Sequence, residues 1–142
     1  MTQKTALVLD DRETHLREVA KSLEKDGYAV TCTQTLATAK QKATEAKTAG
    51  NEFDLIVSDF DLGGKLHQKY RWFDGYRFVA WCKKNGLKSK IILHSTAFEP
   101  HKRIQQWLHR PIIARAQQKG ITVQGKSVLM PSQRPKKRTP RR

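Results

Sequence analysis

The sequence predicts an α/β fold, a doubly wound parallel sheet of five strands. Short apolar runs of strand length alternate with longer segments whose apolar residues recur at helical spacing. The apolar runs lack polar alternation, which is typical of strands buried on both faces of a parallel sheet. All connections but one are short, and the resulting βαβαβαβ order favours helices on both sides of the sheet.

Five apolar runs are the predicted strands. The first, residues 5–9, stops at the acidic pair Asp10 and Asp11. The third, residues 53–58, stops at Asp59, and two glycines soon follow, so we expect the backbone to turn there. The other three strands are predicted at residues 28–32, 90–94 and 121–123.

Segments with one apolar face lie between these strands. Residues 14–25 place Leu16, Val19 and Leu23 on one side of a helix. Further helices are predicted at residues 36–49, 76–84, 100–108 and 112–119. The connection over residues 60–73 exceeds the about 2–6 residues usual between a strand and a helix, and long loops of this kind are often lids or binding loops.

The chain has 142 residues, the size of one domain, and a formal net charge of +15. That charge predicts attraction to nucleic acid or to acidic protein surfaces. Pro, Lys, Arg, Ser and Thr dominate residues 131–142, so we predict a folded domain over residues 1–130 and a disordered basic tail after it. No apolar run approaches the about 20 residues that cross a bilayer, and the amino terminus lacks a signal-peptide pattern. We therefore expect a cytoplasmic protein without membrane contact.

Acidic side chains follow the first and third predicted strands. Asp10 and Asp11 end the first strand, and Asp59 and Asp61 follow the third. Open parallel sheets bind ligands at the carboxyl ends of their strands, so these acids are expected to share one crevice. Crowded carboxylates repel each other unless a cation lies among them, and hard oxygen ligands suit Mg²⁺. The alternative is that these acids only cap the following helices.

At these positions the sequence resembles response-regulator receiver domains. The resemblance runs from Lys4 to about Lys126. It depends on Leu-Val-Leu-Asp-Asp at 7–11, Ile-Val-Ser-Asp-Phe-Asp-Leu at 56–62, Asp-Gly at 74–75 and Ile-Ile-Leu-His-Ser-Thr at 91–96. It implies a flavodoxin-like fold and a module of a two-component system or phosphorelay. Such a module takes a phosphoryl group from a phosphohistidine of a histidine kinase or phosphotransfer protein.

The resemblance also implies roles for the acids. Asp59 would be the phosphoacceptor. Asp10 and Asp11 would be the acidic pair that holds Mg²⁺ together with Asp59, with Asp11 the more direct ligand. Asp61 would offer its backbone carbonyl to the metal. An aspartate nucleophile that forms an aspartyl phosphate is an established form of covalent catalysis.

Two further positions match groups that contact the phosphoryl oxygens in receiver domains. Ser95 aligns with the switch hydroxyl, and Thr96 replaces it if the register slips by one. Lys126 is the candidate for the lysine that follows the fifth strand. Phosphoryl transfer needs such cationic and hydroxyl donors on the equatorial oxygens, which supports these roles on chemical grounds. By contrast, His94 is expected to be a packed histidine, because side chains alternate along a strand and His94 would point away from the side of Ser95.

The sequence departs from the receiver pattern in three places. The connection over residues 60–73 is longer than in the family, and Ser127 stands where the family usually has proline. No amphipathic helix follows Lys126, although the family builds its output face from its fourth and fifth helices and fifth strand. We expect this face to be truncated, rebuilt from residues 112–119, or completed by another chain, as in a homodimer.

Three functions are compatible with the sequence. The favoured one is a stand-alone phosphoacceptor that signals through protein contacts and has no enzymatic turnover. The alternative is a degenerate receiver that acts as a binding scaffold, with the basic tail contacting nucleic acid or an acidic partner. A phosphatase is the third, because Asp59 and Asp61 also resemble the Asp-x-Asp motif of haloacid-dehalogenase-like enzymes. In that family, however, the motif follows the first strand, and here it follows the third.

Overall fold

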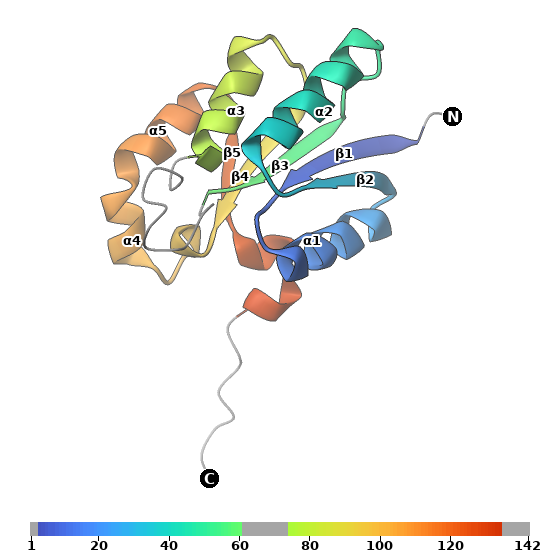
Figure 1. Ribbon diagram of the computed structural model, residues 1–142. Helices are drawn as coiled ribbons and strands as arrows, with labels where there is room; N and C mark the ends of the chain where they lie inside the picture. Colours follow the sequence, from blue (N-terminus) through green and yellow to red (C-terminus); the bar gives the residue numbers. More distant parts are fainter. Residues whose placement is uncertain (1–2, 61–73, 135–142) are drawn as a thin grey trace.

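Five parallel strands form one sheet in the order β2-β1-β3-β4-β5 in the computed structural model, which describes residues 3–60 and 74–134 (Figure 1). The strands are β1 (Lys4–Leu9), β2 (Tyr28–Thr33), β3 (Leu55–Asp59), β4 (Lys90–Ser95) and β5 (Thr122–Gly125). The chain passes from β1 outward to β2 and then returns to β3 on the other side of β1. This reversal creates a topological switch point at the carboxyl ends of β1 and β3.

The described residues contain five α-helices. They are α1 (Glu13–Lys25), α2 (Leu36–Thr48), α3 (Asp74–Lys84), α4 (Arg103–Leu108) and α5 (Arg110–Gln118). Three 3₁₀ turns are also present in these residues: η2 (Thr96–Phe98) after β4, and η3 (Lys126–Val128) and η4 (Pro131–Gln133) after β5. None of the helices within these ranges is long and apolar enough to cross a bilayer.

Helices cover both faces of the sheet, which confirms the predicted fold class. Alternate residues of β1 point to opposite sides, as strand geometry requires. Leu7 and Leu9 belong to a core with α2, α3 and α5, whereas Ala6 and Val8 belong to a second core with α1. Both faces of the central strands are therefore buried, which explains why their sequences are continuous apolar runs.

The segment after β5 covers the α1 side of the sheet without forming a helix of normal length. Leu129 and Met130, which follow η3, pack into the core beneath α1. The Ser22 hydroxyl of α1 donates a hydrogen bond of 2.6 Å to the Leu129 carbonyl. Residues 112–119 cannot supply the missing helix on this side, because Ala116 of α5 packs in the opposite core. Helix α5 lies instead beside β5 and α4, the elements of the expected output face.

Folded structure also extends past Pro131, where the disordered tail was expected to begin. Pro131–Gln133 form η4, and the Ser132 hydroxyl donates hydrogen bonds to the carboxylate of Glu18 on α1. This anchor holds residues 131–134 against the domain. Residues 135–142 lie outside the described residues, as do residues 61–73, which include Asp61 and nearly all of the long connection.

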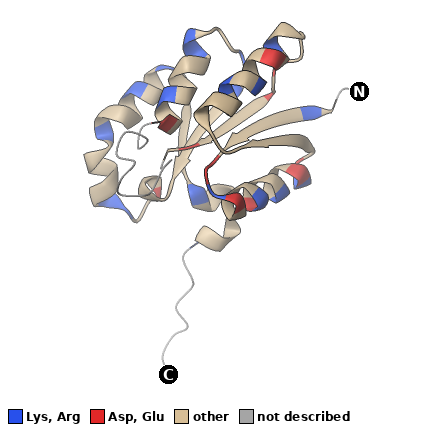
Figure 2. Ribbon diagram, viewed as in Figure 1, with Lys and Arg blue, Asp and Glu red and all other residues tan. Residues whose placement is uncertain are grey.

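Basic side chains are spread over all the helical layers rather than gathered on one element (Figure 2). Acidic side chains also occur on the helices, whereas Asp10 and Asp59, at the carboxyl ends of β1 and β3, are buried. The two buried acids therefore lie at the carboxyl end of the sheet, beneath a surface that is mainly basic.

Candidate functional site

Asp10 and Asp59 lie side by side at the switch point. β1 and β3 pair as far as Leu9 and Ser58. The residue after each of these is an aspartate, so Asp10 and Asp59 lie next to each other. Both side chains are buried, with 0% and 1% of their surfaces exposed. The neighbouring Asp11 is exposed at the surface. The structure therefore brings the acids of two separate strands together, as the sequence predicts.

The Asp10 carboxylate lacks full compensation for its burial. Its Oδ1 atom accepts a hydrogen bond of 2.9 Å from the backbone N–H of Arg12. Its Oδ2 atom has no hydrogen-bond donor among the described residues. Burial raises the pKa of Asp10 to about 6, although Lys126 and the Arg12 N–H act in the opposite direction. A buried carboxylate with an uncompensated oxygen fits a divalent cation, because the cation would supply the missing charge.

Lys126 supplies one positive charge to the two aspartates. Its Nζ atom lies 3.1 Å from Oδ1 of Asp59 and 3.8 Å from Oδ2 of Asp10. Its side chain is buried at the start of η3, directly after β5. The same Nζ atom is 3.0 Å from Nδ1 of His15 on α1. Burial and the Lys126 charge lower the pKa of His15. An ammonium group can only donate, so Nδ1 of His15 is the acceptor in this contact.

The two hydroxyl candidates have different surroundings. The Ser95 hydroxyl accepts a hydrogen bond of 3.0 Å from the Ala97 N–H and caps η2. Thr96 borders a cavity of about 200 Å³ beside the acids. The cavity is lined by Arg12, His15, Asp59, Thr96, Lys126 and Gln133. Thr96 thus shares an opening with Asp59 and Lys126, while Ser95 has a capping role in this structure.

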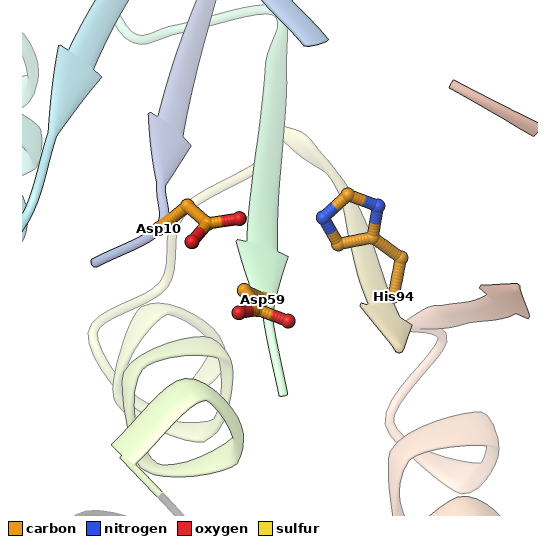
Figure 3. Close-up of side chains that lie close together, drawn as sticks. All are labelled: Asp10, Asp59 and His94. Atoms are coloured by element: carbon orange, nitrogen blue, oxygen red, sulfur yellow. The ribbon is translucent and has the colours of Figure 1, made fainter. Parts of the chain in front are cut away.

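His94 belongs to the same cluster, a result that the sequence analysis missed. It pairs with Asp59 across β3 and β4 and is completely buried. Ligand atoms of Asp10, Asp59 and His94 all lie within 4.8 Å of one another (Figure 3). Alternation does separate His94 from Ser95, but it turns the imidazole towards the acids. The interpretation as a histidine that only packs was therefore incomplete, because the pairing of His94 with Asp59 depends on the register between β3 and β4 and has no local signal in the sequence.

Gly75 allows α3 to approach the end of β3. A Cβ atom at this position would lie 1.9 Å from the Asp59 carbonyl oxygen and 2.9 Å from the Phe60 Cα atom. The Ser58 hydroxyl contacts the Gly75 carbonyl oxygen at 3.3 Å. The Asp-Gly motif therefore fixes where the backbone that carries Asp59 can lie.

Glu99 connects the loop after β4 to the residue after Lys126. The Ser127 N–H and hydroxyl donate hydrogen bonds of 2.6 and 2.8 Å to the Glu99 carboxylate. Gly125 leaves room for this carboxylate, because a Cβ atom there would lie 2.4 Å from Glu99 Oε2. Proline at position 127 would lack the N–H donor, so serine makes this connection possible.

Replacing Glu99 by alanine is expected to lower the free energy of unfolding by about 2 kcal/mol, because it leaves the Ser127 N–H without its buried acceptor. Ser127→Ala removes only the hydroxyl contact and should cost about 1 kcal/mol or less. Urea denaturation of both variants tests this order. Equal losses would show that the backbone N–H contact contributes nothing.

Comparisons with known proteins identify the fold. No family model and no curated protein matches the sequence. A response-regulator receiver domain protein from Clostridium thermocellum is similar in structure, with a TM-score of 0.63, 18% identity and coverage of 87% of this chain and 82% of that chain. The chemotaxis response regulator CheY4 of Vibrio cholerae has a TM-score of 0.60 and 20% identity, over 92% of this chain and 96% of that chain.

A CheY-like receiver domain protein from Methanospirillum hungatei has a TM-score of 0.59 and 19% identity, over 88% of this chain and 82% of that chain. The protein therefore has the fold of response-regulator receiver domains, as its motifs predict. At this level of identity the likeness concerns the fold, and the role of each residue depends on the geometry described above.

Proposed function

We propose that this chain is a phosphoacceptor receiver module of a two-component system or phosphorelay. Asp59 would accept a phosphoryl group from a phosphohistidine of a histidine kinase or phosphotransfer protein. The observation that carries the proposal is the position of Asp59: a buried carboxylate at the end of β3, 3.1 Å from Lys126 Nζ and beside an open cavity. The receiver fold and the buried acidic cluster support this role.

In the transfer step, a carboxylate oxygen of Asp59 attacks phosphorus in line with the phosphorus–nitrogen bond. That bond breaks, the donor histidine leaves with its electron pair, and an aspartyl phosphate forms. The ammonium group of Lys126 and the hydroxyl of Thr96 border the same cavity and can donate to the phosphoryl oxygens. When bound by Asp10, Asp11 and Asp59, Mg²⁺ would supply charge neutralisation between the carboxylates and the incoming group.

The proposal is an acceptor without turnover rather than a phosphatase, because the acidic motif follows β3 and not the first strand. Output through protein contacts is supported by an apolar patch on α4. Ile104, Trp107 and Leu108 have 73%, 63% and 60% of their surfaces exposed. Contiguous exposed apolar side chains of this kind mark interaction sites. The scaffold alternative depends mainly on the basic tail, of which residues 135–142 lie outside the described residues.

The test is a melting experiment with Mg²⁺ and beryllofluoride, a mimic of the phosphoryl group. A ligand at 100 times its Kd adds about 2.7 kcal/mol to stability. We therefore expect Tm of the wild type to rise by about 8 °C. Asp59→Asn should abolish this shift, whereas Asp26→Asn, at an exposed acid after α1, should retain it.

Covalent labelling complements the melting experiment. A small phosphodonor such as acetyl phosphate should label the wild type in the presence of Mg²⁺ and leave Asp59→Asn unlabelled. Labelling that persists in Asp59→Asn would contradict the assignment of the acceptor. Nucleic-acid binding that survives Asp59→Ala, without any labelling of the wild type, would support the scaffold instead.

A further inference from the structure

Three side chains from adjacent strands form a layer beyond the core on the α1 side. Val8, Val57 and Ile92 pack in that core. Two residues further along β1, β3 and β4 are Asp10, Asp59 and His94. Because side chains repeat every two residues along a strand, all three project to the same side and meet above the core (Figure 3).

The burial of His94 is not compensated by hydrogen bonds. The side chain is completely buried, and neither ring nitrogen has a hydrogen-bond partner among the described residues. Complete burial disfavours the charged form of the ring. An unsatisfied buried polar group is destabilising. A neutral imidazole aimed at two carboxylates is, however, the form that binds metal ions.

We propose that Asp10, Asp59 and His94 form a site for a divalent first-row transition-metal ion, with the His94 imidazole as its nitrogen ligand. Carboxylates alone suit Mg²⁺, whereas an imidazole shifts preference towards ions such as Co²⁺ and Zn²⁺. The ligands of one such ion lie about 3–3.5 Å apart. The ligand atoms now lie within 4.8 Å of one another, so the three side chains have to close this distance when an ion binds.

The buried polar atoms without hydrogen bonds in this cluster agree with a metal site. Oδ2 of Asp10 and both nitrogens of His94 are buried polar atoms without hydrogen bonds among the described residues. One ion would satisfy an atom on each residue. Lys126 is the competing cation, because its Nζ atom lies 3.1 Å from Asp59 and 3.8 Å from Asp10. Metal binding therefore has to displace or weaken these ion pairs, and Lys126→Met should bind the ion more tightly than the wild type does.

This inference rests on the proposed function and deepens it, because it adds an imidazole ligand, and with it a preference for transition-metal ions, to the acidic site described there for Mg²⁺. It can nevertheless be tested without phosphoryl transfer. The experiment is a titration of the full chain with Co²⁺, followed by visible absorbance, and with Mg²⁺, followed by the shift in Tm. The variants are His94→Leu, which removes the imidazole, and His101→Ala, which removes an exposed histidine as the matched control.

We expect the wild type to bind Co²⁺ at least about 100-fold more tightly than Mg²⁺. His94→Leu should lose at least about tenfold in Co²⁺ affinity and keep its Mg²⁺ affinity within about twofold. His101→Ala should behave like the wild type. Cys32 is exposed, but it is present in all of these proteins, so its own Co²⁺ binding does not change between them.

Unchanged Co²⁺ affinity in His94→Leu would overturn the inference. If His94→Leu loses affinity for both ions, His94→Cys decides, since a thiolate restores a ligand for transition metals. Recovery of Co²⁺ affinity supports the inference, and failure to recover overturns it. Co²⁺ binding through His94 in a protein that acetyl phosphate does not label would retain the metal site and reject the phosphoacceptor function.

Discussion

Replacing Gly75 by alanine is expected to lower the free energy of unfolding by about 3 kcal/mol. The added methyl group would lie 1.9 Å from the Asp59 carbonyl oxygen, and its other near neighbours are also backbone atoms. A backbone cannot rotate away as the end of a long side chain can. Either the start of α3 or the end of β3 must move. Because β3 carries Asp59, the variant should also be labelled more slowly by acetyl phosphate in Mg²⁺.

Gly50→Ala is the matched control for this substitution. Gly50 has a φ of +75°, but a Cβ atom there would meet nothing within 4 Å. Its cost should therefore be limited to backbone strain of about 1 kcal/mol. Urea denaturation and labelling of both variants separate the two causes. A Gly75→Ala protein that is as stable as Gly50→Ala would show that the contact with β3 is easily relieved.

The sheet could be predicted because burial on both faces produces continuous apolar runs. The third strand was placed at residues 53–58, whereas β3 is Leu55–Asp59. The Asp54 carboxylate accepts a hydrogen bond of 2.8 Å from the Thr5 N–H, and the Asp54 backbone bonds to Thr5 and Lys90, so this residue connects the start of β3 to both neighbouring strands. Such a contact between strands is not visible in local composition.

The segment after β5 could not be predicted in the same way. η3 and η4 are each three residues long, which is too short to produce an apolar period. Leu129 and Met130 nevertheless cover the sheet beneath α1. Their role depends on where β5 ends relative to α1, which is a property of the folded chain. The sequence therefore indicated that no helix follows β5, but it did not indicate which residues cover the sheet in its place.

The candidate site illustrates the same limit. Asp10 and Asp59 were found because an acid directly after an apolar run indicates a strand end. His94 lies within an apolar run, so only the register between β3 and β4 reveals that it faces Asp59. The choice between Ser95 and Thr96 likewise depends on the geometry of the η2 turn. Local patterns thus predicted the acids at the strand ends. The positions of the other site residues, such as His94, depend on the pairing between strands and on the turn that follows β4.

Replacing Asp10 by asparagine is expected to raise the free energy of unfolding at pH 7.5, in the absence of divalent ions, by about 3 kcal/mol. Burial raises the pKa of Asp10 from 3.8 to about 6, a difference of about two units. Each unit corresponds to about 1.4 kcal/mol. The substituted amide carries no charge and can keep the acceptor for the Arg12 N–H. The same variant should lose its stabilisation by Mg²⁺.

The direction of this change in the free energy of unfolding follows from proton binding at Asp10. Between about pH 4 and pH 6 the folded wild type holds a proton on Asp10 that the unfolded chain has released. Wild-type stability therefore falls as pH rises through this window, and the penalty is complete above it. The amide of the Asp10→Asn variant does not titrate, so the difference in stability between the two proteins should shrink as the pH approaches 4.

Urea denaturation of wild type and Asp10→Asn between pH 4 and pH 8, with EDTA or with Mg²⁺, measures this difference. Asp26→Asn, at an exposed acid, should follow the wild type at every pH. A difference that did not vary with pH would contradict the role of the Asp10 charge. Acid and Mg²⁺ should each reduce the difference, because a proton removes the buried charge and the cation compensates it. Together these effects would show that the protein retains a destabilising carboxylate at the position where a cation is needed.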